Sequence, residues 1–241
     1  MRNIFLILIV LLITNIIVQT AFADDKILVV TESWYPYNYL DKTGGIVGKS
    51  TEVVKAVLDD TGLDYAIEMN PWSRAFNIAS SQANVLIYSI LRTPDRENFF
   101  HWICPISILE QHKVYKLSSR MDVDVNTEQE IKKYTTGVTD NTFLHKYMSN
   151  LGFVDGENLQ VNSDDSVSIK MFLAGRIDLL VSLESSMMRT LIQKGLDTSI
   201  VSPLFTLPGK IYPPNCMALS KQTPINVVNK IRQAHHRFIS Q

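Results

Sequence analysis

Short apolar runs alternate with amphipathic stretches along the first half of the chain. Residues 26–31, a compact β-branched run, and residues 84–90 predict buried strands, and residues 65–69 predict a further strand. Between the first two lies an apolar stripe at helical spacing, for which Ser50 or Thr51 is the expected N-cap and Gly62 the end. Asn70-Pro71 then begins a second helix, with Asn as N-cap and Pro in the first turn. This order predicts a mainly parallel sheet with ligands at the carboxyl ends of its strands.

The second half repeats this alternation with different residues. Strands are expected at 135–139, 159–161, 177–182 and 216–219, and helices at 142–151, 164–174, 184–194 and from 223 to about 239. The pattern predicts an α/β protein of two lobes, each a mostly parallel sheet flanked by helices. The lobes are expected to join through residues near 104–118 and 205–217.

The first 23 residues have the pattern of an export signal. A short cationic start, Met1-Arg2-Asn3, precedes an unbroken apolar run from Ile4 to Ile13, and Ala21-Phe22-Ala23 gives a small-x-small cleavage site. The run is shorter than the roughly 20 residues of a membrane-spanning helix, which favours a signal peptide over an anchor. We therefore expect cleavage after Ala23 and a periplasmic protein. Its predicted parts are lobe 1 over 24–111, lobe 2 over 112–211, and a return strand with a C-terminal helix packed on lobe 1 over 212–241.

Charge and cysteine content narrow the function further. Lys and Arg total 23 against 24 Asp and Glu, with no basic block, so the sequence gives no reason to expect nucleic-acid binding. Cys104 and Cys216 are the two cysteines. In an oxidising compartment they pair, or else they stay as two buried thiols, and the sequence leaves both alternatives open.

Common enzyme and cofactor motifs are absent from the sequence. It contains no Gly-x-Ser-x-Gly, no phosphate-binding loop, no dinucleotide fingerprint and no Cys-x-x-Cys. His235 and His236 are adjacent on a predicted helix and point about 100° apart, so they do not suit a shared metal ion. We expect a protein that is not an enzyme and holds no cofactor or metal.

Three clusters are candidates for ligand binding. Residues 32–39 place Glu32 and four aromatic rings directly after the first strand, where the rings either stack on a ligand or pack in a loop. Arg92 and Arg96 follow another strand, where they either hold a carboxylate or form a surface ion pair with Asp95. Trp72 and Arg74 lie on the first turn of a helix and face different ways, so one packs while the other reaches the cleft.

The order of these elements resembles the bacterial extracellular solute-binding proteins of family 3, receptors of ABC importers for polar amino acids. The resemblance covers nearly all of residues 26–240. It is carried by Tyr35-Pro36-Tyr37, Gly44-Gly45-Ile46-Val47-Gly48, Arg92-Thr93-Pro94-Asp95-Arg96 with Phe99 and Pro105, and Leu173-Ala174-Gly175-Arg176-Ile177-Asp178.

The resemblance implies the two-lobe type II fold of periplasmic binding proteins, closing on its ligand by a hinge. It assigns the carboxylate-binding arginine to Arg96, the stacking aromatic to Trp34 with Tyr37 nearby, and the helix start that meets the carboxylate to Asn141-Thr142.

The chain also departs from the family at three positions. Leu91 occupies a position where the family often has Ser or Thr, two residues beyond Ser89. Leu183 takes the place of the amine-binding aspartate, with Glu184 one residue along, and Asn84 replaces an aspartate.

We therefore expect a monomeric periplasmic receptor for a small carboxylate-bearing solute, an amino acid or analogue, that delivers it to the membrane subunits of an ABC importer. The alternatives are a cyclohexadienyl-type dehydratase on the same scaffold, with Glu32 or Glu184 as general acid, and a ligand-sensing partner of a membrane receptor. The predicted ligand-binding residues are Glu32, Trp34, Tyr37, Trp72, Arg74, Ser89, Arg92, Arg96, Asn141, Thr142 and Glu184.

Overall fold

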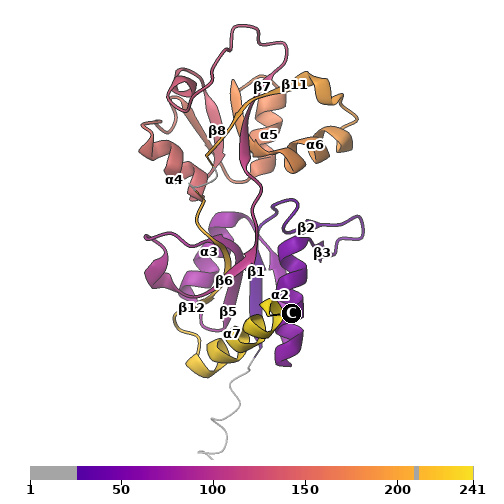
Figure 1. Cartoon of the computed structure of the whole chain (residues 1–241), viewed down its shortest axis with the longest axis vertical. Helices are drawn as coiled ribbons and strands as arrows, with labels where there is room; N and C mark the ends of the chain where they lie inside the picture. Colours follow the sequence, from indigo (N-terminus) through magenta and orange to yellow (C-terminus); the bar gives the residue numbers. More distant parts are fainter. Residues whose placement is uncertain (1–25, 209–211, 241) are drawn as a thin grey trace, which may run out of the picture.

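Two five-stranded sheets divide the molecule into two lobes, which two crossing segments connect (Figure 1). The structure, a computed structural model, describes residues 26–208 and 212–240. The predicted signal peptide lies outside the described residues. The α/β fold with two lobes that the sequence predicts is confirmed.

Lobe 1 contains the sheet formed by the first strands of the chain and by one strand from near the C-terminus. Its strands lie in the order β4 (Tyr65–Met69), β1 (Ile27–Thr31), β5 (Val85–Leu91), β12 (Asn215–Ser220) and β6 (Phe100–Ser107). Strands β4, β1 and β5 are parallel, whereas β12 is antiparallel to both of its neighbours. The helices are α2 (Lys49–Thr61), α3 (Trp72–Ser81) and α7 (Ile225–Ile239), and β2 (Tyr39–Leu40) pairs with β3 (Ile46–Val47).

Lobe 2 has the strand order β11 (Val201–Thr206), β7 (His112–Leu117), β10 (Leu179–Leu183), β8 (Thr136–Thr139) and β9 (Leu159–Asn162). Strands β10, β8 and β9 are parallel, and β7 is antiparallel to both of its neighbours. The helices are α4 (Phe143–Asn150), α5 (Asp165–Leu173) and α6 (Glu184–Gln193). Short 3₁₀ turns are η1 (Glu97–Phe99), η2 (Glu130–Lys133) and η3 (Thr198–Ile200).

The inner strands β1 and β5 of lobe 1 are buried on both faces because helices cover both sides of the sheet, whereas the edge strand β4 is only half-buried. Val29 belongs to the core under α2 and α7, while its neighbour Val30 belongs to the core under α3. Successive side chains of a strand point to opposite faces, so a continuous apolar run is what a doubly covered strand needs. In lobe 2, α4 similarly covers one face and α5 and α6 the other.

The start of α2 differs from the prediction. Gly48 is the N-cap, and the amides of Ser50 and Thr51 donate to the Tyr37 carbonyl at 3.0 and 3.3 Å. A Cβ on Gly48 would lie 2.4 Å from that same oxygen, at a φ of 126°. The helix is therefore capped by a distant backbone carbonyl, which requires glycine there. Pro71, and not Asn70, is the N-cap of α3.

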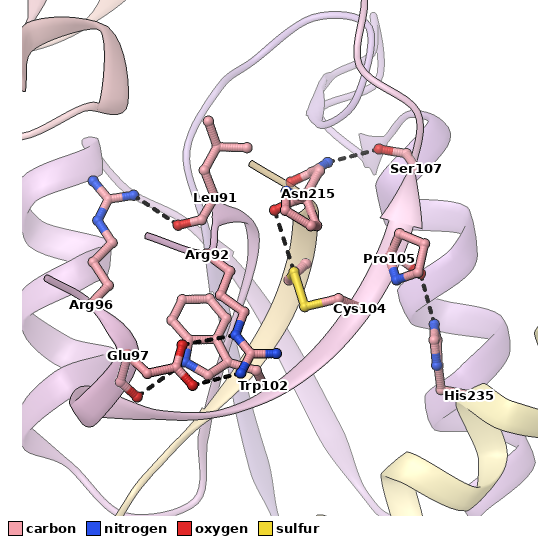
Figure 2. Close-up of a disulfide and its surroundings, with 12 residues drawn as sticks. Leu91, Arg92, Arg96, Glu97, Trp102, Cys104, Pro105, Ser107, Asn215 and His235 are labelled. Atoms are coloured by element: carbon pink, nitrogen blue, oxygen red, sulfur yellow. Dashed lines mark hydrogen bonds and ion pairs between the residues drawn. A yellow bond between two sulfur atoms is a disulfide. The ribbon is translucent and has the colours of Figure 1, made fainter. Parts of the chain in front are cut away.

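Three strands of the two five-stranded sheets, β6, β7 and β11, have no counterpart among the predicted elements. β7 lies within the segment 104–118 expected only to join the lobes, and β6 and β11 each overlap a joining segment at their ends. Two of them contain a proline, Pro105 in β6 and Pro203 in β11, which weakens a strand pattern. The chain crosses from β6 to β7 and returns from β11 to β12. At the base of these crossings a disulfide joins Cys104 to Cys216, with Cα atoms 4.5 Å apart (Figure 2).

Candidate ligand-binding site

A cavity lies between the lobes, at the carboxyl ends of parallel strands in both sheets. Its lining comes from both lobes and includes charged, aromatic and hydroxyl side chains, the mixture typical of a site for a small solute. Lobe 1 contributes Glu32, Ser33, Trp34, Trp72, Ser89, Leu91 and Arg96 to its lining. Lobe 2 and the crossings contribute His112, Val138, Thr139, Thr142, Phe143, Leu144, Asp165, Val181, Ser182, Leu183 and Tyr212.

Arg96 is the buried cation of this cavity. Its side chain is 7% exposed, and its guanidinium carbon lies 5.0 Å from the Trp72 ring centroid. One Nη atom donates to the carbonyl of Leu91 at 3.3 Å, and the other donates across the cleft to that of Asn141 at 2.6 Å. Burial lowers the pKa of Arg96, while the charges of Asp95 and Glu32 oppose that shift. Its remaining N–H groups can still bind a carboxylate.

Arg92, one of the predicted ligand-binding residues, does not line the cavity. Its guanidinium forms an ion pair with Glu97 at 2.5 Å, and both side chains are more than two-fifths exposed. Figure 2 shows Arg92 turned toward Glu97 and Trp102, while Arg96 points the other way. The two arginines differ because Arg92 extends directly from β5, whereas Arg96 follows a tight turn (its amide donates to Thr93 O at 3.0 Å).

Two carboxyl groups line the cavity, one from each lobe. Glu32 directly follows β1, and burial, together with the negative charge of Asp165, raises its pKa to about 8 despite the opposing charge of Arg96. Asp165 begins α5, and burial followed by the charge of Asp164 raises its pKa to about 6. At neutral pH the cavity therefore contains a protonated Glu32.

Three aromatic rings stack along one wall of the cavity. His112 lies between Trp34, at 6.5 Å with planes inclined by 20°, and Tyr212, at 5.3 Å with planes inclined by 18°. Burial lowers the pKa of His112 to about 3, so the imidazole is neutral across the physiological range. Trp34 comes from lobe 1, while His112 and Tyr212 stand at the ends of the two crossings. The stack thus connects the cavity wall to the hinge segments.

Six of the predicted residues line this cavity, namely Glu32, Trp34, Trp72, Ser89, Arg96 and Thr142. Ser89 is buried, with a φ of +59°, and its hydroxyl donates to the Asn38 side chain. Thr142 caps α4, accepting from the His145 amide at 3.2 Å. The cavity therefore brings together parts of all three predicted clusters.

Four further predicted residues, besides Arg92, do not line the cavity. Tyr37 is fully buried behind Trp34, and its hydroxyl accepts from the Glu110 amide at 2.6 Å. Arg74 is exposed on α3, because Trp72 is the member of that pair that turns inward. Glu184 points outward from α6 and pairs with Lys113 at 2.5 Å. Asn141 offers its backbone carbonyl to Arg96 and Trp72, and it lines a separate, outer cavity.

Seven polar or aromatic residues of the lining are not among the predicted ligand-binding residues: Ser33, His112, Thr139, Phe143, Asp165, Ser182 and Tyr212. Asp165 enters the sequence-based expectations only as part of the helix over 164–174, whose N-cap is Asp164, accepting from the Val167 amide at 3.1 Å. Thr139 has a detectable signal, since it ends a predicted strand. His112 and Tyr212 have none, because they lie in segments expected only to connect the lobes.

Contacts outside the cavity hold the lobes together on both sides. On one side Lys146 pairs with Asp95 at 2.8 Å. On the other, the Ser186 hydroxyl donates to Tyr35 O at 2.8 Å, and the Arg189 guanidinium lies 4.3 and 4.1 Å from the ring centroids of Tyr35 and Tyr39. The structure is therefore a closed form in which both lobes face the cavity.

Two negative findings concern the described residues alone. Within 26–208 and 212–240, no group of three or more His, Cys, Asp or Glu side chains is arranged to hold a metal ion. In the same ranges no helix has the length and apolar character needed to span a bilayer.

Two α/β lobes that enclose a cavity between strand ends define a protein of the periplasmic-binding-protein fold. The family model of the bacterial extracellular solute-binding proteins, family 3, matches residues 27–230, and the chain belongs to this family. The family assignment made from the sequence motifs is therefore confirmed.

Solved structures share the fold at low sequence identity. A histidine kinase sensor domain similar to periplasmic binding proteins superposes with a TM-score of 0.77 at 14% identity, covering 89% of this chain and 90% of that one. An ancestral arginine-binding protein bound to arginine gives 0.75 at 15% identity, covering 90% and 93%. The arginine-, lysine-, histidine-binding protein ArtJ from Geobacillus stearothermophilus gives 0.74 at 20% identity, covering 89% and 90%. No curated protein matches the chain significantly in sequence.

Proposed function

We propose that this chain is a periplasmic receptor that captures a small carboxylate-bearing solute, an amino acid or close analogue, for an ABC importer. The observation that carries the proposal is the position of Arg96, a buried guanidinium in a cavity between two closed lobes. A guanidinium binds a carboxylate through paired, charge-assisted hydrogen bonds. Glu32, in the same cavity, is placed to meet a cationic group of the same solute.

A cavity lined by both lobes suits a protein that captures and then releases a solute. Trp34 and Trp72 from lobe 1 and Thr142 from lobe 2 line the same cavity, so a solute held there contacts both lobes at once. Such a solute stabilises the closed form over an open one by its extra contacts. A membrane transporter that recognises only the closed form would then receive loaded receptor. The shared fold of the arginine-binding structures agrees with an amino-acid-like ligand.

A thermal-shift panel of amino acids, organic acids and polyamines on ligand-stripped protein tests the proposal. A solute at 100 times its Kd stabilises the protein by about 2.7 kcal/mol. We expect an amino-acid hit whose affinity falls about tenfold or more in Arg96→Ala, since hydrogen bonds to charged groups contribute about 1.5–3 kcal/mol. Arg92→Ala, which removes an exposed arginine four residues earlier, is the matched control and should leave affinity unchanged.

The ligand itself supplies a second control, because Arg96 also bridges the lobes through Asn141. Replacing the ligand's carboxylate by a carboxamide should weaken binding to the wild type but cause no further loss in Arg96→Ala. If the carboxamide weakens binding equally in both proteins, the carboxylate lies elsewhere and the proposal for Arg96 is wrong.

One observation favours the enzyme alternative. The raised pKa of Glu32 leaves a proton in the cavity at neutral pH, as a general acid requires. Glu184 is not a candidate, since it is exposed and paired with Lys113. Incubation with prephenate-like cyclohexadienyl acids separates the two functions: turnover that Glu32→Gln abolishes would support the enzyme, and its absence the receptor.

A further inference from the structure

Asp165 gives the cavity a second carboxylate that the sequence did not lead us to expect, opposite Glu32. We propose that Glu32 and Asp165, one from each lobe, form a pair that binds a cationic amine or guanidinium group of the solute. This inference rests on the proposed function, since it concerns the ligand that the cavity takes.

The geometry leaves both carboxylates available. Glu32 lies at the carboxyl end of β1, and Asp165 is the first residue of α5 across the cleft, with both lining one cavity. In the part of the chain that the structure describes, no group donates a hydrogen bond to either side chain. Asp164 shows the contrast, because its carboxylate accepts from the Ser166 hydroxyl at 2.6 Å and from the Val167 amide.

The surroundings do not neutralise the pair. Asp164 is a further carboxylate whose charge raises the pKa of both groups. His112 is neutral, and burial raises the pKa of Tyr212 above its usual range, so neither supplies a positive charge. Among the described lining residues Arg96 is the single cation, and two of its N–H groups already bind main-chain carbonyls.

Burial first, and nearby negative charge second, raise the pKa of both carboxyl groups. With pKa values of about 8 for Glu32 and about 6 for Asp165, the pair carries one proton at pH 7. A cation that enters takes the proton's place, so one positive charge enters the cavity and one leaves it. The affinity for such a solute should then rise about tenfold per pH unit between pH 6 and 8. The affinity for a solute without a cationic group should stay the same between pH 6 and 8.

The first experiment needs no ligand. Carboxyl-carbon NMR of the full mature chain, with Glu32→Gln used to assign the resonance, measures the Glu32 titration directly. We expect a midpoint near pH 8 that moves down in Asp165→Asn but stays above the ordinary value, because burial remains. Asp124→Asn, the same change at an exposed lobe 2 position, is the control and should not move it. A Glu32 midpoint near 4.5, or one unchanged by Asp165→Asn, would overturn the pair.

The second experiment compares two probes of nearly the same shape, L-arginine and L-citrulline, which differ in having a guanidinium or a neutral ureido group. We expect arginine to bind at least tenfold more tightly at pH 8, with this preference falling toward unity at pH 6 and in Asp165→Asn. Calorimetry in buffers of different ionisation enthalpy should show close to one proton released for arginine and none for citrulline. Equal, pH-independent affinities for the two probes would refute the exchange.

The failure of the proposed function has a different signature. If neither amino acid binds, methylguanidinium and methylurea test the pair without a carboxylate. A fall in the Glu32 midpoint with methylguanidinium alone would support the pair while removing the amino-acid function. No change with either probe would overturn the pair as well.

Discussion

The disulfide makes lobe 2 a closed loop inserted into lobe 1, and its removal has a calculable effect. The bond joins residues 112 positions apart, and the whole lobe 2 sheet lies between them. In the chain-entropy relation a loop of that length contributes about 4.8 kcal/mol at 25 °C. The double variant Cys104→Ala/Cys216→Ala should therefore lower the free energy of unfolding by about that amount if both lobes unfold together.

A smaller loss is expected if lobe 2 stays folded while lobe 1 unfolds. The Leu207 amide donates to His112 O at 2.8 Å, so folded lobe 2 already holds the two crossings together. The disulfide then closes only the two short crossings, and the loss falls to about 3 kcal/mol, the value for a loop of roughly 15 residues. The size of the loss therefore reports whether the lobes unfold as one unit.

Urea denaturation with two probes measures this difference. The three tryptophans, Trp34, Trp72 and Trp102, all belong to lobe 1, so fluorescence follows that lobe, whereas far-UV circular dichroism follows both. Coincident transitions should accompany the larger loss and separated transitions the smaller one. Wild-type protein reduced before unfolding should match the variant. A loss below about 1 kcal/mol in the fluorescence transition would refute the loop-closure reasoning.

Two other perturbations have defined outcomes. Arg189→Ala removes contacts with Tyr35 and Tyr39 that contribute about 1.4 kcal/mol together, so the closed-to-open ratio should fall about tenfold. Small-angle scattering of the ligand-free Arg189→Ala protein should then show a larger radius of gyration than wild type. The control variant Arg176→Ala, which changes an exposed arginine, should leave the radius unchanged. An unchanged radius in both variants would contradict the role of Arg189 in holding the lobes closed. Burial lowers the pKa of His112 to about 3 in the folded protein, so below pH 6.5 the unfolded chain takes up a proton that the folded protein does not. The free energy of unfolding should therefore fall by about 1.4 kcal/mol per pH unit between pH 6.5 and about 3. Urea midpoints at pH 7 and 4.5 should show a smaller loss for His112→Phe than for wild type, and equal losses would exclude this linkage.

Local patterns predicted the elements well because each depends on neighbours in sequence. The run at 26–31 is β1, and the stripe through Val54 and Leu58 is the buried face of α2. The cap of α2 was predicted wrongly, since the Tyr37 carbonyl reaches it from a distant loop. No periodicity within residues 48–62 contains that contact.

The candidate site was predicted only in part, for a related reason. Arg92 and Arg96 have the same side chain and lie four residues apart, yet one pairs with Glu97 in solvent and the other is buried over Trp72. A single turn after β5 decides between them, and its direction relative to lobe 2 is not encoded in their spacing.

The alternation of strands and helices, the two-lobe class and the family follow from periodicity and from motifs of consecutive residues, so they could be predicted from the sequence. The meeting of Glu32, Arg96, His112, Asp165 and Tyr212 in one cavity is visible in the folded protein alone. They come from both lobes and both crossings, and their side-chain environments exist only once the lobes have closed. Burial and mutual charge then set their protonation, which no isolated segment of the chain can do.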